Sequence, residues 1–74
     1  MNLARKAGEI GGTLPAVLNA ANEVAVDAFI SHRINFPQIS EVVRRAMDRH
    51  QVTVHPTLEQ ILAADAWART ETLP

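Results

Sequence analysis

The 74-residue sequence contains no cysteine, and it has only three glycines, four prolines and three aromatic residues, one tryptophan and two phenylalanines. The absence of cysteine excludes the disulfides that hold many small secreted domains together, and it excludes thiolate zinc sites and cysteine nucleophiles. A chain of this length forms one small domain at most and buries only roughly 60% of its unfolded surface. We therefore expect a single core of marginal stability.

An excess of one charge is also absent, because 7 basic and 8 acidic residues leave a formal net charge of −1. Such a chain has no strong field to draw it onto nucleic acid or anionic lipid. Apolar runs are short, since Asn19, Asn22, Glu23 and Asp27 interrupt the most hydrophobic segment, and a membrane span needs about 18 apolar residues. The amino terminus does not resemble a signal peptide. We expect no nucleic-acid partner, no membrane partner and a cytoplasmic location.

The few glycines are grouped near the amino terminus, where Gly8, Gly11 and Gly12 bracket a predicted break between helices. Glycine supplies the left-handed conformation that ends a helix and weakens a helix that contains it. Residues 2–7 are therefore predicted to be the last turns of a first helix, whose beginning could lie outside this chain.

The next block predicts a helix of about residues 14–31. Thr13 is a suitable N-cap, and Pro15 stands in the first turn, where its missing N–H costs little. At 100° per residue, one apolar face is predicted to form the contact with the core. That face contains Leu14, Val17, Leu18, Ala21, Val24, Ala25, Ala28 and Phe29.

The opposite side of this helix carries a polar row of Asn19, Glu23 and Asp27 at i, i+4 and i+8. Val26 and Ile30 lie near that row rather than with the core face. Their position predicts a second, smaller apolar contact.

A clean amphipathic helix is predicted for residues 37–49, after Pro37. Its apolar face contains Ile39, Val42, Val43, Ala46 and Met47. On the other face, Glu41 can pair with Arg45 and Arg44 with Asp48 at i, i+4 spacing, each pair adding about 0.2 to 0.5 kcal/mol. Residues 51–55 are predicted to be an extended connector, too short for a sheet.

The last helix is predicted to begin at Leu58, because Thr57 and Gln60 have capping-box spacing. Its buried stripe is predicted to be Leu58, Ile61 and Leu62. The next turn puts Asp65 and Arg69 on the same bearing and Trp67 almost opposite. Either this helix changes its contacts along its length, or Asp65 and Arg69 meet a polar partner.

Together these segments predict an all-α fold, a small antiparallel helical bundle of three full helices plus a partial first helix. Abundant alanine supports close approach between the helices.

Some residues have the chemistry of a site and need to be weighed. Glu23 and Asp27, one turn apart, could share a metal or exchange a proton, but a solvated or capping role is the favoured interpretation. His32, His50 and His55 have separations of 18 and 5, which fit no zinc motif, and they are interpreted as loop residues.

Two further features are weighed in the same way. Gly8, Gly11 and Gly12 follow no strand and precede no Lys-Ser or Lys-Thr pair, so a helix break is favoured over a phosphate loop. A basic strip of Arg44, Arg45 and Arg49 could contact phosphate, but interspersed acids favour a solvated face.

The interpretation of two polar pairs depends on their burial. Asn19 and Asn22 are poor mid-helix residues, and a buried polar role and simple surface exposure remain equally open for them. For Asp65 and Arg69, a partly buried pair that fixes the docking of the last helix is favoured over an exposed pair. Trp67 also needs a cover, because a lone exposed tryptophan is unusual on a small monomer.

The block PAVLNAANEVAV at residues 15–26, with Ala28 and Phe29 following, resembles the carboxy-terminal domain of 1-deoxy-D-xylulose 5-phosphate reductoisomerase. The ending DAWAR at residues 65–69 supports the resemblance, which covers nearly all of the chain. It implies that residues 1–74 are the helical domain of a longer enzyme that isomerises and reduces deoxyxylulose phosphate to methylerythritol phosphate in non-mevalonate isoprenoid synthesis.

The resemblance further implies an amino-terminal NADPH-binding domain, a central catalytic domain that uses magnesium or manganese, and a homodimeric parent. The metal-binding and phosphate-holding residues of the family belong to the central domain, so no catalytic, cofactor or metal residue is assigned here. Met1 stands where the first bundle helix of the family is already under way. The expected partner is the catalytic domain of the parent chain, reached through a surface containing Val26, Ile30 and Trp67.

Two other functions remain as alternatives. A free-standing helical interaction module could bind a partner helix through the same three residues, and it would require no longer chain. A nucleic-acid binder using Arg44, Arg45 and Arg49 would show steeply salt-dependent affinity, and the net charge counts against it. The sequence leaves open whether the chain alone is monomeric.

Overall fold

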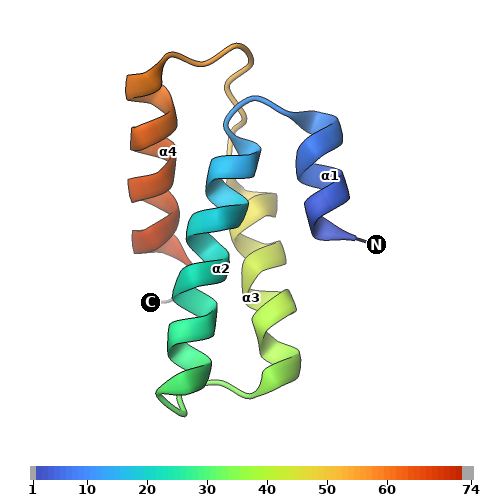
Figure 1. Cartoon of the computed structure of the whole chain (residues 1–74), viewed down its shortest axis with the longest axis vertical. Helices are drawn as coiled ribbons and strands as arrows, with labels where there is room; N and C mark the ends of the chain where they lie inside the picture. Colours follow the sequence, from blue (N-terminus) through green and yellow to red (C-terminus); the bar gives the residue numbers. More distant parts are fainter. Residues whose placement is uncertain (1, 73–74) are drawn as a thin grey trace.

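A computed structural model of the chain describes residues 2–72, and within this range it contains helices and no strand. The four helices are α1 (Leu3–Ile10), α2 (Leu14–Ile30), α3 (Phe36–Arg49) and α4 (Leu58–Glu71). Helices that follow one another along the chain run antiparallel (Figure 1). The predicted all-α antiparallel bundle with a short first helix is confirmed.

The helix starts that were predicted from capping residues agree with the structure to within a residue. The Thr57 side chain accepts a hydrogen bond from the Gln60 backbone N–H at 3.2 Å, and the Thr57 N–H donates to Gln60 Oε1 at 2.9 Å. A second capping box, of Asn35 and Gln38, begins α3 at Phe36. Each box satisfies N–H groups that the first turn would otherwise leave unpaired.

The first helix departs from its prediction, because α1 continues through Gly8 and ends at Ile10. Asn2 is its N-cap, and the Asn2 side chain accepts from the Arg5 backbone N–H at 3.1 Å. The chain breaks instead at Gly11 and Gly12, whose φ angles are +72° and +59°. A glycine can remain inside a helix at a modest cost, whereas two consecutive left-handed residues cannot.

The central element is α2, which packs against each of the other three helices. Its buried face is largely alanine, so the neighbouring backbones approach closely. The core residues contributed by α2 and α3 are Leu14, Val17, Ala20, Ala21, Ala25, Val43, Ala46 and Met47. The predicted apolar faces of these two helices are therefore largely confirmed, with Leu18, Ile39 and Val42 packed at the edge. Phe29 is a correction, because it is 38% exposed.

The predicted stripe of α4 is wrong. Leu58 is 69% exposed and Leu62 is 60% exposed, while Ala64 and Ala68 are the buried residues of this helix. The buried face of α2 is largely alanine, and α4, which packs on α2, likewise buries small side chains and turns its leucines outward. Trp67, on the same helix, packs partly buried against the core.

The helices cover one another unequally. In Figure 1, α1 and α4 lie beside the first part of α2, and the α2–α3 hairpin continues beyond both of them. We call its end, residues 29–38, the α2–α3 tip. No helix within the described residues is long and apolar enough to span a membrane.

Candidate functional site

The polar partner that the sequence left open for α4 is a carboxylate on α2. Arg69 Nε donates to Asp65 Oδ1 at 2.7 Å, and another nitrogen of the same guanidinium bonds Glu23. The hydrogen bonds from Asp65 and then Glu23 raise the pKa of Arg69 above its usual value. The side chains of Asp65 and Arg69 are 32% and 44% exposed. The pair is thus partly exposed, and through Glu23 it links α4 to α2.

The ion network gives one member of the acidic row a structural partner, because the Glu23 carboxylate bonds the Arg69 guanidinium and links α2 to α4. Asp27, one turn on from Glu23, lines a shallow hollow together with Glu23 and Arg69. Within residues 2–72, no three His, Cys, Asp or Glu side chains come together in a way that could hold a metal ion.

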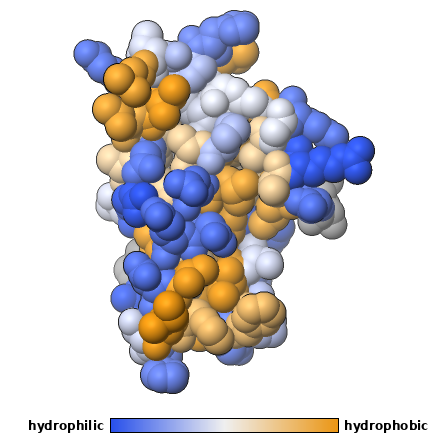
Figure 2. Space-filling view, in the orientation of Figure 1, coloured by the Kyte–Doolittle hydropathy of each residue, from blue (hydrophilic) through white to orange (hydrophobic). Residues whose placement is uncertain are grey.

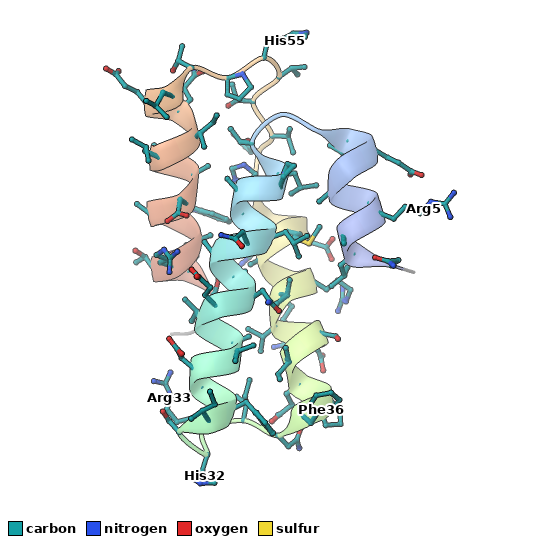
Figure 3. The ribbon with its side chains drawn as sticks, in the orientation of Figure 1. Arg5, His32, Arg33, Phe36 and His55 are labelled. Carbon is teal, nitrogen blue, oxygen red and sulfur yellow. The ribbon has the colours of Figure 1, made fainter. Side chains whose placement is uncertain are left out.

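The three histidines do not come together in one metal-binding group within the described residues. His32 and His55 are exposed loop residues with φ angles of 61° and 51°, and they lie at opposite ends of the molecule (Figure 3). His50 is the C-cap residue of α3 and is partly buried. The interpretation of His32 and His55 as loop residues agrees with the structure, but His50 has a structural role that the sequence did not reveal.

That role is a partly buried polar cluster, which we call the latch, formed by Thr13, His50 and Thr53. The Thr13 hydroxyl lies 2.7 Å from His50 Nε2, and it accepts a hydrogen bond from the Thr53 N–H at 3.0 Å. The Thr13 N–H donates to the Thr53 carbonyl at 3.1 Å. Thr13 is only 1% exposed. It stands at the predicted N-cap of α2, but its hydroxyl bonds the α3–α4 connector instead of the helix.

Trp67 covers this latch. Its ring lies 5.1 Å from the imidazole of His50, measured between centroids, with a tilt of 42°. Burial lowers the pKa of His50, which favours the neutral ring. In this form Nε2 can accept a hydrogen bond from the Thr13 hydroxyl. Trp67 is half-buried within the chain, packed against the core and beside His50. The predicted interaction surface of Val26, Ile30 and Trp67 is corrected on this point.

The glycine break serves the same latch. A Cβ atom on Gly12 would lie 2.3 Å from the Thr53 carbonyl oxygen and 2.9 Å from a methyl carbon of Val52. Only glycine allows the α1–α2 turn to approach the connector this closely. This contact explains the glycine at position 12 without a phosphate group.

The remaining candidates are surface groups. Asn19 and Asn22 are both exposed, which decides between the two open interpretations. On α3, Arg44 bonds Asp48 and Arg45 bonds Glu41, each at 2.8 Å, as predicted. Arg49 donates to the backbone carbonyl of Glu71. The basic strip is thus tied to partners on its own domain.

Comparisons with known proteins agree on one family. The sequence model described as "DXP reductoisomerase C-terminal domain" matches residues 1–71. A protein named 1-deoxy-D-xylulose 5-phosphate reductoisomerase from a Synechococcus strain is 60% identical over 72 residues, which are 97% of this chain and 18% of that protein. Proteins of the same name from Desulforamulus reducens and Ruminiclostridium cellulolyticum are 56% and 53% identical over 71 and 70 residues.

Those two alignments cover 96% and 95% of this chain and again 18% of each relative. The chain therefore spans less than a fifth of the length of the curated relatives it matches. No solved structure gives a significant match. Because the family model covers nearly every residue, the chain belongs to the DXP reductoisomerase C-terminal domain family.

Proposed function

We propose that residues 1–74 are a non-catalytic, structural carboxy-terminal domain of a longer 1-deoxy-D-xylulose 5-phosphate reductoisomerase. The observation that supports this proposal is that two side chains able to act as an acid or a base form hydrogen bonds within the fold. Glu23 is tied to Arg69 between helices, and His50 is bonded to Thr13 in the latch. Both contacts hold separate segments together, and within residues 2–72 no three His, Cys, Asp or Glu side chains form a group that could hold a metal ion.

The parent enzyme is proposed to isomerise and reduce 1-deoxy-D-xylulose 5-phosphate to 2-C-methyl-D-erythritol 4-phosphate in isoprenoid biosynthesis, as a cytoplasmic homodimeric oxidoreductase. NADPH and magnesium or manganese would supply hydride and Lewis-acid chemistry. The residues of this chain do not fit either group. Its paired glycines form a turn between helices against the Thr53 carbonyl, and the described acids and histidines form no three-ligand cluster. NADPH and metal binding are proposed for the amino-terminal and central domains of the parent, as the family resemblance implies.

The role left to this chain is mechanical. A bundle whose helices are fixed by the latch and by the Glu23–Arg69 contact presents a rigid surface on which a catalytic domain can rest. Rigid support of this kind holds catalytic groups within the tolerance that chemistry needs, without touching the substrate. The catalytic domain would be a partner in the same chain.

Removal of the domain tests the proposal. A suitable enzyme is a full-length chimera in which this chain replaces the matching segment of the Synechococcus relative, at 60% identity. We expect deletion of the segment to abolish turnover and to lower the thermal unfolding midpoint, because packing is lost, while the number of metal ions bound per chain is unchanged. Normal turnover after deletion would refute the proposal. The free-standing alternative predicts instead a gene that does not continue upstream of Met1.

A further inference from the structure

The α2–α3 tip carries the largest exposed apolar side chains near one end of the molecule. Phe29, Ile30 and Phe36 are 38%, 66% and 71% exposed. The rings of Phe29 and Phe36 meet edge to face, with 5.8 Å between their centroids. Figure 2 shows the resulting hydrophobic area at the lower end of the visible face, separated by hydrophilic residues from a second area near the start of α4. Contiguous exposed apolar area of this kind marks an interaction site.

The tip is also hollowed. An open hollow there is lined by Phe29, Ile30, His32, Arg33, Ile34, Asn35, Phe36 and Gln38. No acidic residue is in this lining. His32, Arg33 and Phe36 gather at the tip in Figure 3, whereas Arg5 and His55 lie away from it on α1 and on the α3–α4 connector.

Arg33 distinguishes this surface from the rest of the domain. The chain has seven Lys and Arg residues, and within residues 2–72 six of them hold an acidic side chain or a backbone carbonyl. These six are Arg5, Lys6, Arg44, Arg45, Arg49 and Arg69. Among the described contacts, the Arg33 guanidinium has no such partner. The acid nearest in sequence, Asp27, lines a different hollow beside Arg69.

We propose that the α2–α3 tip docks on the remainder of the reductoisomerase chain, on a face that offers apolar side chains to Phe29 and Phe36 and a carboxylate to Arg33. This inference rests on the proposed function. The matched relatives extend far beyond the 18% that this chain spans, so ample chain exists to cover the tip. An unpaired guanidinium that lines the same hollow as two aromatic rings suits a carboxylate with apolar neighbours.

The chain offers a matched pair of positions for the test. Phe36 and Leu58 are each the first residue of a helix that begins with a capping box, and they are 71% and 69% exposed. Aspartate is well accepted in a first turn because it faces the positive end of the helix dipole. Phe36→Asp and Leu58→Asp therefore make the same local change at opposite ends of the molecule.

The experiment compares amide hydrogen exchange of the 74-residue chain with that of the full-length chimera. We expect residues 29–38 to exchange about tenfold more slowly, or slower still, in the chimera, because docking must open before exchange. Phe36→Asp should remove this extra protection, and Leu58→Asp should retain it.

The charge of Arg33 is tested in the same hydrogen-exchange experiment. Arg33→Glu should remove the extra protection of residues 29–38 in the chimera, and Arg33→Lys should keep most of it. The control is Arg5→Glu on α1, an exposed arginine whose partner is Glu9. That reversal should leave the tip protected.

Several outcomes would overturn the inference. Equal exchange of the tip in the short and full-length chains would show that nothing docks there. Loss of protection with Leu58→Asp but not Phe36→Asp would assign docking to the other end. Dimerisation of the 74-residue chain that Phe36→Asp abolishes would assign the tip to a second copy. If deletion of the domain stops turnover while the tip variants behave like the parent chimera, only the docking face is wrong.

Discussion

At the scale of single residues, the latch joins segments that are distant in sequence. Thr13 contacts His50 and Thr53, which follow it by 37 and 40 positions. Because the Thr13 hydroxyl accepts from the Thr53 N–H, its own proton is free to bond a neutral imidazole. Protonation of His50 would reverse that hydrogen bond, so that the hydroxyl oxygen accepts from both Nε2–H and the Thr53 N–H, and the hydroxyl proton would lose its acceptor on the imidazole.

A pH dependence of stability follows from this arrangement. Burial lowers the pKa of His50 below its usual value of 6.5, so the unfolded chain binds more protons between the lowered pKa and 6.5. The free energy of unfolding should therefore rise with pH through that window and reach its full value above it. Urea unfolding followed by Trp67 fluorescence, from pH 5 to 7.5, measures this rise.

Two variants isolate the contribution of His50. His50→Gln keeps a hydrogen-bonding side chain without a titration in this range, so it should flatten the rise. His32→Gln, in an exposed loop, should leave the rise intact. An unchanged slope in His50→Gln would contradict the role given to the latch.

Two glycine substitutions should act in opposite directions. Gly12→Ala should destabilise the chain by about 1 to 3 kcal/mol from backbone strain at φ +59°. The clash of the new Cβ, 2.3 Å from the Thr53 carbonyl oxygen, should add to this loss. Gly8→Ala should stabilise it by about 0.5 to 1 kcal/mol, because Gly8 is helical and its Cβ position is open. Thermal and urea unfolding of both variants give these values. Equal effects would show that the turn does not approach the connector as described.

The sequence predicted the local features at this scale and missed the long-range one. Thr57 and Gln60 form the predicted capping box because that signal is contained in four consecutive residues. Thr13 was placed correctly at an N-cap, but its hydroxyl bonds a segment that no periodicity links to it. A pattern within one helix carries no information about which distant connector lies beside it.

At the scale of helices, α4 is the element whose packing differs most from its pattern. Their hydrophobicity favoured Leu58 and Leu62 for the core, yet α4 buries Ala64 and Ala68 and packs on α2, whose buried face is largely alanine. A small-to-small contact brings two helices closer and excludes leucine from the seam. The faces of α2 and α3 were predictable because valine, leucine and methionine mark them directly.

This packing predicts unequal effects along α4. Ala68→Leu should destabilise the chain by about 1 to 3 kcal/mol through overpacking, because Ala68 is 0% exposed. Ala63→Leu places the same side chain on the exposed side of the same helix and should be within about 0.5 kcal/mol of neutral. Chemical denaturation provides the comparison.

Truncation of an exposed leucine on α4 tests the same packing. Leu62→Ala should cost little, because Leu62 is 60% exposed. A loss of about 2 kcal/mol or more, typical of a buried leucine, would restore the stripe of Leu58, Ile61 and Leu62 that the sequence favoured.

At the scale of the whole molecule, stability should decrease along α2. Its first part lies among three helices, whereas the tip has only α2 and α3 (Figure 1). Segments with less buried contact open at lower free energy. In the 74-residue chain, amides of Ala20 and Ala21, both 0% exposed, should exchange much more slowly than those of residues 29–35. Uniform protection along α2 would contradict this gradient.

The sequence predicted the fold class and the family, but not the exposed apolar surface. Periodicity predicted a small helical bundle without a catalytic set, and the resemblance at residues 15–26 indicated the family. Which apolar residues remain exposed was not predictable, because it depends on how far α1 and α4 extend beside α2. Trp67 packs beside His50, whereas Phe29 and Phe36 are the exposed aromatic residues.

We propose that this chain supports a catalytic domain and performs no chemistry of its own. Calorimetric titration of the 74-residue chain with manganese(II), and separately with NADPH, distinguishes a supporting domain from one that binds reactants. We predict no saturable binding of either, because Glu23 is held by Arg69 and the glycine turn is filled by the Thr53 carbonyl. Saturable binding of one metal ion or one nucleotide per chain would contradict the account.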